Sequence, residues 1–277
     1  MKFRITVLCE NSVGPISGTL GEHGFAALIE SAGAEPILFD TGQGATLLHN
    51  ARRMNKDLSK VDCVAISHGH YDHAGGLLPL LQECGRKKVY AHPAIFRARH
   101  RLKDSGECLA IGIPHSRADL KAAGADFNLS ADFCTIAPHI YLTGEIPRAT
   151  SFEIGDQGLY CDGTGQEIDS TPDDQSMVLE TDKGLVVITG CCHAGLVNTL
   201  EHVADSMGRR DIYAVIGGTH LGFCRQEQLE QTISALKSWR VQKVTASHCT
   251  GFAASTRLSR EMPKEFQMAL VGFTLEA

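Results

Sequence analysis

The residues with the clearest chemical meaning lie in the stretch Ser67-His68-Gly69-His70-Tyr71-Asp72-His73-Ala74-Gly75-Gly76-Leu77. Three imidazoles and one carboxylate fall within six positions there, and these groups are the ligands that zinc, iron and manganese accept in proteins. His68 and His70 can point the same way from an extended segment, whereas Asp72 and His73 lie where the chain is expected to turn into a helix. The spacing therefore predicts two adjacent metal positions.

This stretch follows the strand-like run 61–66 and precedes a helix-like run, and in that context it resembles the signature of the metallo-β-lactamase superfamily. The resemblance implies that His68 and His70 bind one metal and that Asp72 and His73 bind the other. It implies two divalent metal ions as cofactors, with zinc favoured and iron or manganese as alternatives. It also implies an α/β fold, an αββα sandwich of two mixed β-sheets flanked by helices.

Three later histidines, His193, His220 and His248, each follow a strand-like run, which is where functional groups of layered sheet proteins gather. The resemblance implies that His248 completes the second metal. The chain departs from the family pattern after Ile188-Thr189-Gly190, where a bridging aspartate is expected and Cys191 stands instead. Either His193 completes the first metal and no carboxylate bridges the two, or Cys191 supplies a thiolate to the second. We favour His193, and we expect Cys191 to be an inert buried thiol.

Several other residues are candidates for supporting roles. Asp40 ends a strand-like run and could accept the free ring N–H of a ligand histidine, although it could equally cap a helix. Asp72 and His220 are the catalytic candidates, with His220, or else His23, moving a proton. The predicted substrate rim consists of four residues: His23, Glu145, Arg148 and Asp174.

The segment 92–138 shows no clear periodicity and is expected to be an irregular insert within a single domain, 1–277. It contains a basic cluster at Arg97, Arg99, His100, Arg101 and Lys103. Such clusters are commonly solvated faces. The alternative is that the insert covers the mouth of the site and that its cations, with Arg148, meet phosphate or a similar anion on the substrate.

Strand-like and helix-like runs alternate through both halves of the chain. Strands are expected at 3–9, 25–30, 36–40, 61–66, 88–91, 176–181, 185–189, 212–216, 243–247 and 270–275, and helices at about 44–54, 76–81, 196–206 and 226–239. Two strand-rich halves with helices between strands are typical of two packed sheets with helices outside, and no linker divides them.

Composition narrows the class of protein. Apolar residues make up 43% of the 277 residues, as is usual for a globular protein. The net charge of −6 argues against nucleic-acid binding through a broad basic surface and favours a small substrate. No run is long enough for a secretory signal or a membrane span, and ten cysteines without a Cys-x-x-Cys pair are typical of reduced thiols. We therefore expect a cytoplasmic protein; a homo-oligomer stays open.

Further motifs resemble a narrower branch of the superfamily, the dihydropteroate-synthase-like enzymes of methanopterin biosynthesis. They are Glu10-Asn11-Ser12-Val13, Glu22-His23-Gly24-Phe25, Thr143-Gly144-Glu145-Ile146-Pro147-Arg148, Pro172-Asp173-Asp174-Gln175-Ser176 and the segment 190–200. Three hypotheses follow: a hydrolase that activates water on an ester or phosphoester, a transferase that joins a pterin methyl diphosphate to an arylamine, and a non-catalytic metal or ligand-binding module.

Overall fold

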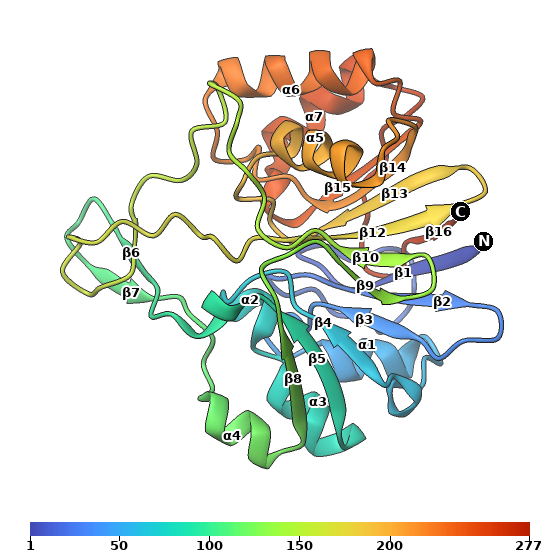
Figure 1. The fold of residues 1–277 in the computed structure, drawn as a ribbon, viewed down its shortest axis with the longest axis vertical. Coiled ribbons are helices and arrows are strands. Elements are labelled where there is room, and N and C mark those ends of the chain that lie inside the picture. The colour runs from blue at the N-terminus through green and yellow to red at the C-terminus, as the bar shows by residue number, and fades with distance from the viewer.

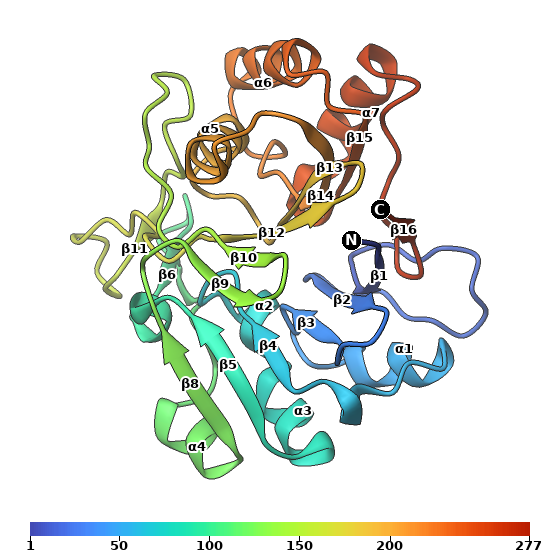
Figure 2. The same ribbon diagram turned by 45° about the vertical axis from the view of Figure 1, so that its right-hand side comes forward.

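The computed structural model describes all residues, 1–277, as two β-sheets packed face to face with helices on both outer sides (Figure 1). Helices α5 (Leu196–Met207), α6 (Gln226–Ser238) and α7 (Gly251–Glu261) cover one outer face. Helices α1 (Leu47–Arg53), α3 (Leu77–Cys84) and α4 (Arg117–Ala122) cover the other, as the turned view in Figure 2 also shows. The αββα sandwich expected from the sequence is confirmed.

The first sheet has seven strands in the order β16-β1-β2-β3-β4-β5-β8. Their bounds are β1 Phe3–Cys9, β2 Ala26–Ser31, β3 Ile37–Phe39, β4 Cys63–Ala65, β5 Lys87–Ala91, β8 Ala125–Leu129 and β16 Thr274–Glu276. Strands β3, β4, β5 and β8 are parallel, so their carboxyl ends meet at one edge.

The second sheet has six strands in the order β15-β14-β13-β12-β10-β9. Their bounds are β9 Cys134–Ala137, β10 Ile140–Leu142, β12 Ser176–Thr181, β13 Gly184–Thr189, β14 Ile212–Gly218 and β15 Lys243–Ser247. Strands β13, β14 and β15 are parallel, and they too end together. The edge where both sets of parallel strands end is where the site lies.

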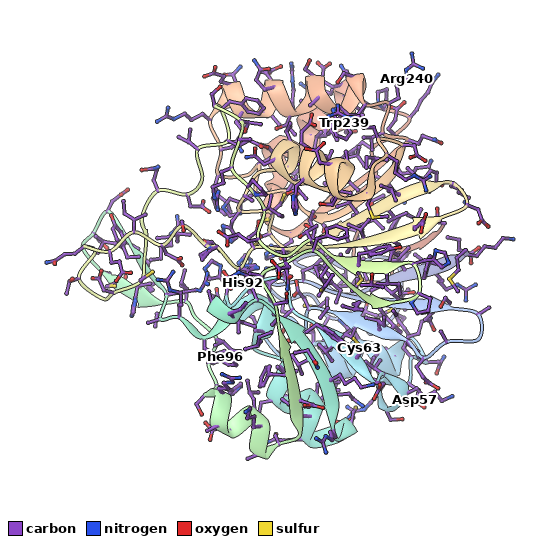
Figure 3. All side chains as sticks on the ribbon, in the orientation of Figure 1. Asp57, Cys63, His92, Phe96, Trp239 and Arg240 are labelled. Carbon is purple, nitrogen blue, oxygen red and sulfur yellow. The ribbon has the colours of Figure 1, made fainter.

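Side chains of the strands alternate between two buried layers, as the pleat requires. One face of β1, with Phe3, Ile5 and Val7, belongs to the cluster between the sheets, which Cys63 of β4 also joins (Figure 3). Leu8 and Leu38 face the helices of the first half instead. A matching layer lies under α5 to α7. Burial on both faces explains why these strands are apolar throughout.

The segment 92–138, expected to be irregular, is largely regular. Beside β8, α4 and β9 it contains β6 (His100–Leu102) and β7 (Cys108–Ala110), and β6 pairs with both β7 and β11 (Leu159–Tyr160) in a third small sheet. Figure 1 shows this sheet projecting from the edge where the parallel strands end. Strands of only two or three residues produce little periodicity in the sequence, so the sequence pattern does not predict them.

Helix α1 begins later than expected, at Leu47 rather than near Gly44. The Glu22 carboxylate accepts hydrogen bonds from the amides of Gln43, Gly44, Ala45 and Thr46, at 3.0 to 3.4 Å. A carboxylate that satisfies these donors takes the place of a cap and holds the chain as a loop before the helix. None of the helices is long and apolar enough to cross a bilayer.

Candidate metal centre

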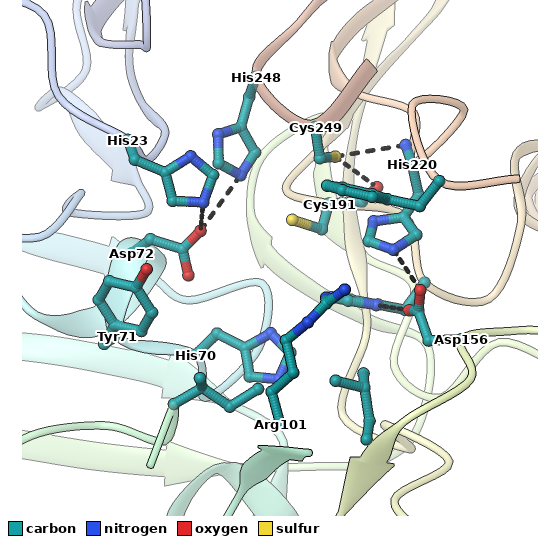
Figure 4. A pocket seen from close by; sticks show the side chains of 14 residues that line it. His23, His70, Tyr71, Asp72, Arg101, Asp156, Cys191, His220, His248 and Cys249 are labelled. Atoms are coloured by element: carbon teal, nitrogen blue, oxygen red, sulfur yellow. Dashed lines mark hydrogen bonds and ion pairs between the residues drawn. The ribbon is translucent and has the colours of Figure 1, made fainter. Parts of the chain in front are cut away.

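The six predicted ligands lie together at the carboxyl ends of the parallel strands, where His70, Asp72, His193 and His248 line a cavity of about 160 Å³ (Figure 4). The loop after β4 and the short helix α2 (Tyr71–Ala74) supply four of them. The turns after β13 and β15 supply His193 and His248, and the turn after β14 supplies His220. Each of these groups therefore stands on a turn held by a buried strand.

His68, His70 and His193 form the first ligand group, and their donor atoms lie within 4.8 Å of one another. His68 Nε2 lies 3.0 Å from His70 Nδ1. His70 Nε2 and His193 Nε2 are buried and have no hydrogen-bond partner. Buried ring nitrogens without partners are costly unless a further group completes them.

Asp72, His73, His248 and Cys191 form the second group, again within 4.8 Å. His73 Nε2 lies 3.2 Å from His248 Nε2 and 3.2 Å from Cys191 Sγ. Asp72 Oδ2 lies 3.3 Å from His248 Nε2 and 3.7 Å from His73 Nε2. Cys191 also belongs to a third group, with His193 and His220. It therefore lies between the two predicted metal positions.

In both histidines of the second group, the Nδ1 atom already forms a hydrogen bond. His73 Nδ1 donates to Asp40 Oδ2 at 2.7 Å, and His248 Nδ1 donates to Asn11 Oδ1 at 2.9 Å. Glu10 accepts from the His248 amide at 2.7 Å. These contacts leave the two Nε2 atoms facing each other, which is how metal-binding histidines are usually oriented.

Asp40 thus lies beside His73, one of the predicted ligands, and it does not cap a helix. Its carboxylate also accepts from the Ser67 amide at 2.7 Å and from the Ser67 hydroxyl at 2.8 Å, so it links β3 to the metal loop. A Cβ on Gly190 would lie 2.1 Å from Ser67 Oγ and 3.0 Å from Asp40 Oδ2. Only glycine leaves room for this contact between the two sheets.

Asp156, which the sequence did not single out, joins two of the histidines. Its carboxylate accepts from His193 Nδ1 at 2.5 Å and from His220 Nε2 at 2.6 Å. It lies in a loop without periodic pattern, and the only sequence signal is a carboxylate within a loop that precedes β11. His220 is therefore held at the cavity wall, close to His193, with ring centroids 4.3 Å apart.

The pKa values follow from burial and from these contacts. Burial lowers the pKa of His68 and of His70, and the neighbouring histidines lower it further. For His73 burial is outweighed by Asp40 and Asp72, which raise its pKa to about 9. Burial would raise the pKa of Asp72, but His73 and the hydrogen bonds from His23 and His248 hold it well below its usual range. Positive charge is therefore favoured at the second group.

The same balance operates around Asp156. Burial opposes ionisation of this carboxyl, yet hydrogen bonds from His193 and His220 hold its pKa far below its usual range. Burial lowers the pKa of His220, but the bond to Asp156 outweighs it and raises that pKa to about 10. Burial raises the pKa of the Cys191 thiol well above its usual value.

The donor set fits divalent metal ions. Imidazole nitrogens, one carboxylate and one sulfur are the ligands that zinc and iron take, and the partnerless nitrogens face one space. His73 Nε2 and His248 Nε2 face each other although the opposite nitrogen of each ring already donates. A cation between them would satisfy both lone pairs.

The structure separates the four predicted rim residues. His23 lies at the cavity, where its Nε2 is 3.1 Å from Asp72 Oδ2. Arg148 lies outside the cavity, and its guanidinium donates to the carbonyls of His193 and Ser170, each at 2.6 Å. Glu145 and Asp174 line the same neighbouring hollow as Arg148. Asp174 is fully buried, accepts from the Ala194 amide at 2.8 Å and has a raised pKa because of its burial.

We expect Asp40→Asn to weaken the second metal position about 10- to 100-fold while the fold survives. Asparagine tolerates the positive φ of 60° that Asp40 adopts and can still accept from the Ser67 amide. Its NH₂ group, however, would face His73 Nδ1 and favour the tautomer whose Nε2 carries the proton. Metal titration of the variant checks this. An unchanged metal affinity at the second position would show that Asp40 only links β3 to the metal loop.

Comparisons with known proteins identify one matching family and several relatives. The model of the metallo-beta-lactamase superfamily matches residues 20–194. The 7,8-dihydropterin-6-methyl-4-(beta-D-ribofuranosyl)-aminobenzene-5'-phosphate synthase of Methanocaldococcus jannaschii is 32% identical over 97% of this chain and 95% of its own length. An uncharacterized protein of the same organism, MJ0448, is 31% identical over 86% of this chain and 88% of its own.

Among solved structures, Tm1679, described as a metal-dependent hydrolase of the beta-lactamase superfamily, superposes with a TM-score of 0.85. It is 31% identical and covers 99% of both chains. A diphosphatase from the PhnP family, 14% identical with a TM-score of 0.56 over 100% of this chain and 98% of its own, shares the fold. The family model and the relatives that span nearly the whole chain lead to one conclusion: the protein belongs to the metallo-β-lactamase superfamily.

Proposed function

We propose that this protein is a metal-dependent hydrolase that holds two divalent ions, zinc being the favoured metal, and cleaves an ester or phosphoester bond of a small anionic substrate. The observation that carries the proposal is the pair of ligand groups, His68-His70-His193 and Asp72-His73-His248; Cys191 belongs to the second and also forms a third group with His193 and His220. When bound, such ions polarise a phosphoryl or carbonyl oxygen and lower the pKa of a water molecule toward neutrality.

The side chains around the cavity have separable tasks in this reaction. The water oxygen forms a bond to the phosphorus or carbonyl carbon, and the bond to the leaving oxygen breaks. His220, held by Asp156 at the cavity wall, is placed to give a proton to that oxygen. His23 lies across the cavity beside Asp72, and it can take the proton that the water loses.

Cys191 supports a mixed nitrogen and sulfur site rather than the inert thiol expected from the sequence. Its sulfur lies 3.2 Å from His73 Nε2 and belongs both to the second group and to the third group, with His193 and His220. It stands where the superfamily pattern has a bridging aspartate, so a thiolate there would supply the anionic ligand that is otherwise missing. A coordinated thiol is deprotonated even where burial alone raises its pKa.

The neighbouring Cys192 provides a matched control for this role. It is equally buried, but its sulfur contacts Thr199 Oγ1 at 3.3 Å and no ligand group contains it. We expect Cys191→Ala to lower the metal affinity about 10- to 100-fold, Cys191→Asp to retain the metal, and Cys192→Ala to behave as the unsubstituted protein. Cobalt substitution checks this, because thiolate-to-cobalt charge-transfer absorption should vanish only with Cys191. If this absorption persisted in Cys191→Ala, Cys191 would be excluded as a metal ligand.

A second candidate function is favoured by the relative from Methanocaldococcus jannaschii, whose printed name is that of a synthase. In the corresponding transfer reaction the arylamine nitrogen bonds to the methyl carbon of a pterin methyl diphosphate, and diphosphate leaves with the bonding electrons. The amine loses a proton, which His23 could accept. No water is consumed, and ions held by the same ligand groups would bind the leaving diphosphate.

One experiment distinguishes these functions. Metal content of the purified protein is measured first, and the metal-loaded protein is then tested with phosphoester, thioester and lactam substrates, and with a pterin methyl diphosphate with and without an arylamine. Hydrolysis without an amine supports the first function. Diphosphate release that needs the amine supports the second. A metal-loaded protein that turns over none of them would be a binding module.

A further inference from the structure

We propose that Arg101, oriented by the ring of Phe223, is the residue that recognises an anionic group, a phosphate or diphosphate, on the substrate of this cavity. The inference rests on the proposed function for the cavity itself, but it concerns only which side chain binds the anion. It replaces the broader expectation that Arg148 and the whole 97–103 cluster do so.

The charges of the basic cluster are mostly engaged elsewhere. Arg99 is fully buried in ion pairs with Asp169 and Asp173. Arg97 lies 3.7 Å from Glu167 and Lys103 lies 2.7 Å from Glu107, both at the surface. The Arg148 guanidinium is bound to two carbonyls. No carboxylate lies within 4.0 Å of the Arg101 guanidinium, so Arg101 is the arginine of the cluster that is free to bind an anion.

The small sheet directs this free charge toward the metal centre. Arg101 of β6 pairs with Leu159 of β11, and side chains directly opposite in a ladder share one face. Leu159 is buried and lines the cavity, and Arg101 lines it too. Figure 4 shows Arg101 extending from the strand edge toward the space between His70 and Asp156.

Phe223 explains why an exposed arginine should have a defined direction. The guanidinium carbon lies 5.9 Å from the centroid of the Phe223 ring, within cation–π range. Phe223 is 59% exposed and follows His220, with ring centroids 5.0 Å apart. An exposed aromatic side chain at the mouth of a cavity has no role in the core. It orients Arg101, and its remaining face is open to a planar part of the substrate.

Binding rather than turnover tests the proposal, because a protein without hydrolase activity would still bind anions through Arg101. We would titrate the zinc-loaded protein with inorganic diphosphate and with phenylphosphonate by calorimetry. Arg101→Gln should weaken both about tenfold, as expected for the loss of a charge-assisted hydrogen bond, and should make binding less sensitive to salt. Arg97→Gln, the matched control, should bind within about twofold of the unsubstituted protein.

Phe223 is a positioning residue, and its variants separate orientation from folding. Phe223→Leu should weaken both anions about two- to fivefold, whereas Phe223→Tyr, which keeps the ring face, should restore binding. The proposal would be overturned if Arg101→Gln bound both anions as tightly as the unsubstituted protein, or if Arg97→Gln weakened binding equally. Arg101-dependent binding without turnover of any substrate would leave this assignment intact and overturn the hydrolase proposal.

Discussion

Asp72→Ala is expected to lower turnover roughly 1,000-fold or more and to reduce the metal content from two ions to about one per chain, with little change in thermal stability. One oxygen of Asp72 lies within 3.1 to 3.7 Å of His23, His73 and His248. Without it the second position loses its only carboxylate. Elemental analysis and thermal melting of the same preparation measure the two effects separately.

The small stability effect follows from the location of Asp72. It belongs to a ligand loop and to none of the hydrophobic clusters between and outside the sheets. Asp62→Ala, which removes an exposed carboxylate paired with Lys88, serves as the control and should change neither metal content nor turnover. If Asp72→Ala failed to fold even in excess metal, the loop would be a structural element instead.

The second large effect is expected in stability, from Arg99→Met. Arg99 and its partners Asp169 and Asp173 are at most 1% exposed, and Asp173 also accepts from the Gly69 amide at 2.8 Å. Methionine would leave two buried carboxylates without their cation. We expect a loss of about 3–5 kcal/mol and a melting temperature lower by roughly 10 °C.

Arg97→Met is the matched control for this stability measurement. Its ion pair with Glu167 is exposed and long, so the change should cost less than about 1 kcal/mol. Because Gly69 stands between His68 and His70, Arg99→Met should also weaken the first metal position. Equal melting temperatures for the two variants would show that the buried network contributes nothing.

Much of the site could be predicted because its residues are local in sequence or end a clear strand. The loop 68–73 carries four ligands in six positions, and His193 and His248 each follow an apolar run. The structure brings all six together, in the two groups expected from the resemblance. Apolar runs in the sequence similarly predicted most of the ten expected strands within two residues of their observed bounds, because apolar patterning determines where a strand can be buried.

What the sequence could not supply were contacts made only by the folded chain. Asp156 accepts hydrogen bonds from two histidines that lie 37 and 64 positions away in the sequence, and no residue spacing predicts these contacts. Arg99 belongs to a basic cluster in the sequence that is typical of an exposed surface. It is buried nevertheless, because Asp169 and Asp173 from a distant loop form ion pairs with it. Arg148 was expected at the substrate because a free guanidinium suits phosphate, but two backbone carbonyls occupy it.

The predicted ligands come from both sheets, and this has a consequence for the lifetime of the folded protein. His73 contacts Cys191 and His248, which lie 118 and 175 positions away on the opposite sheet. An ion shared by these residues would act as a cross-link that closes very long loops in the unfolded chain. Releasing the ion would then require the two halves to part, so the lifetime of the folded state and the rate of metal exchange would be governed by the same opening motion.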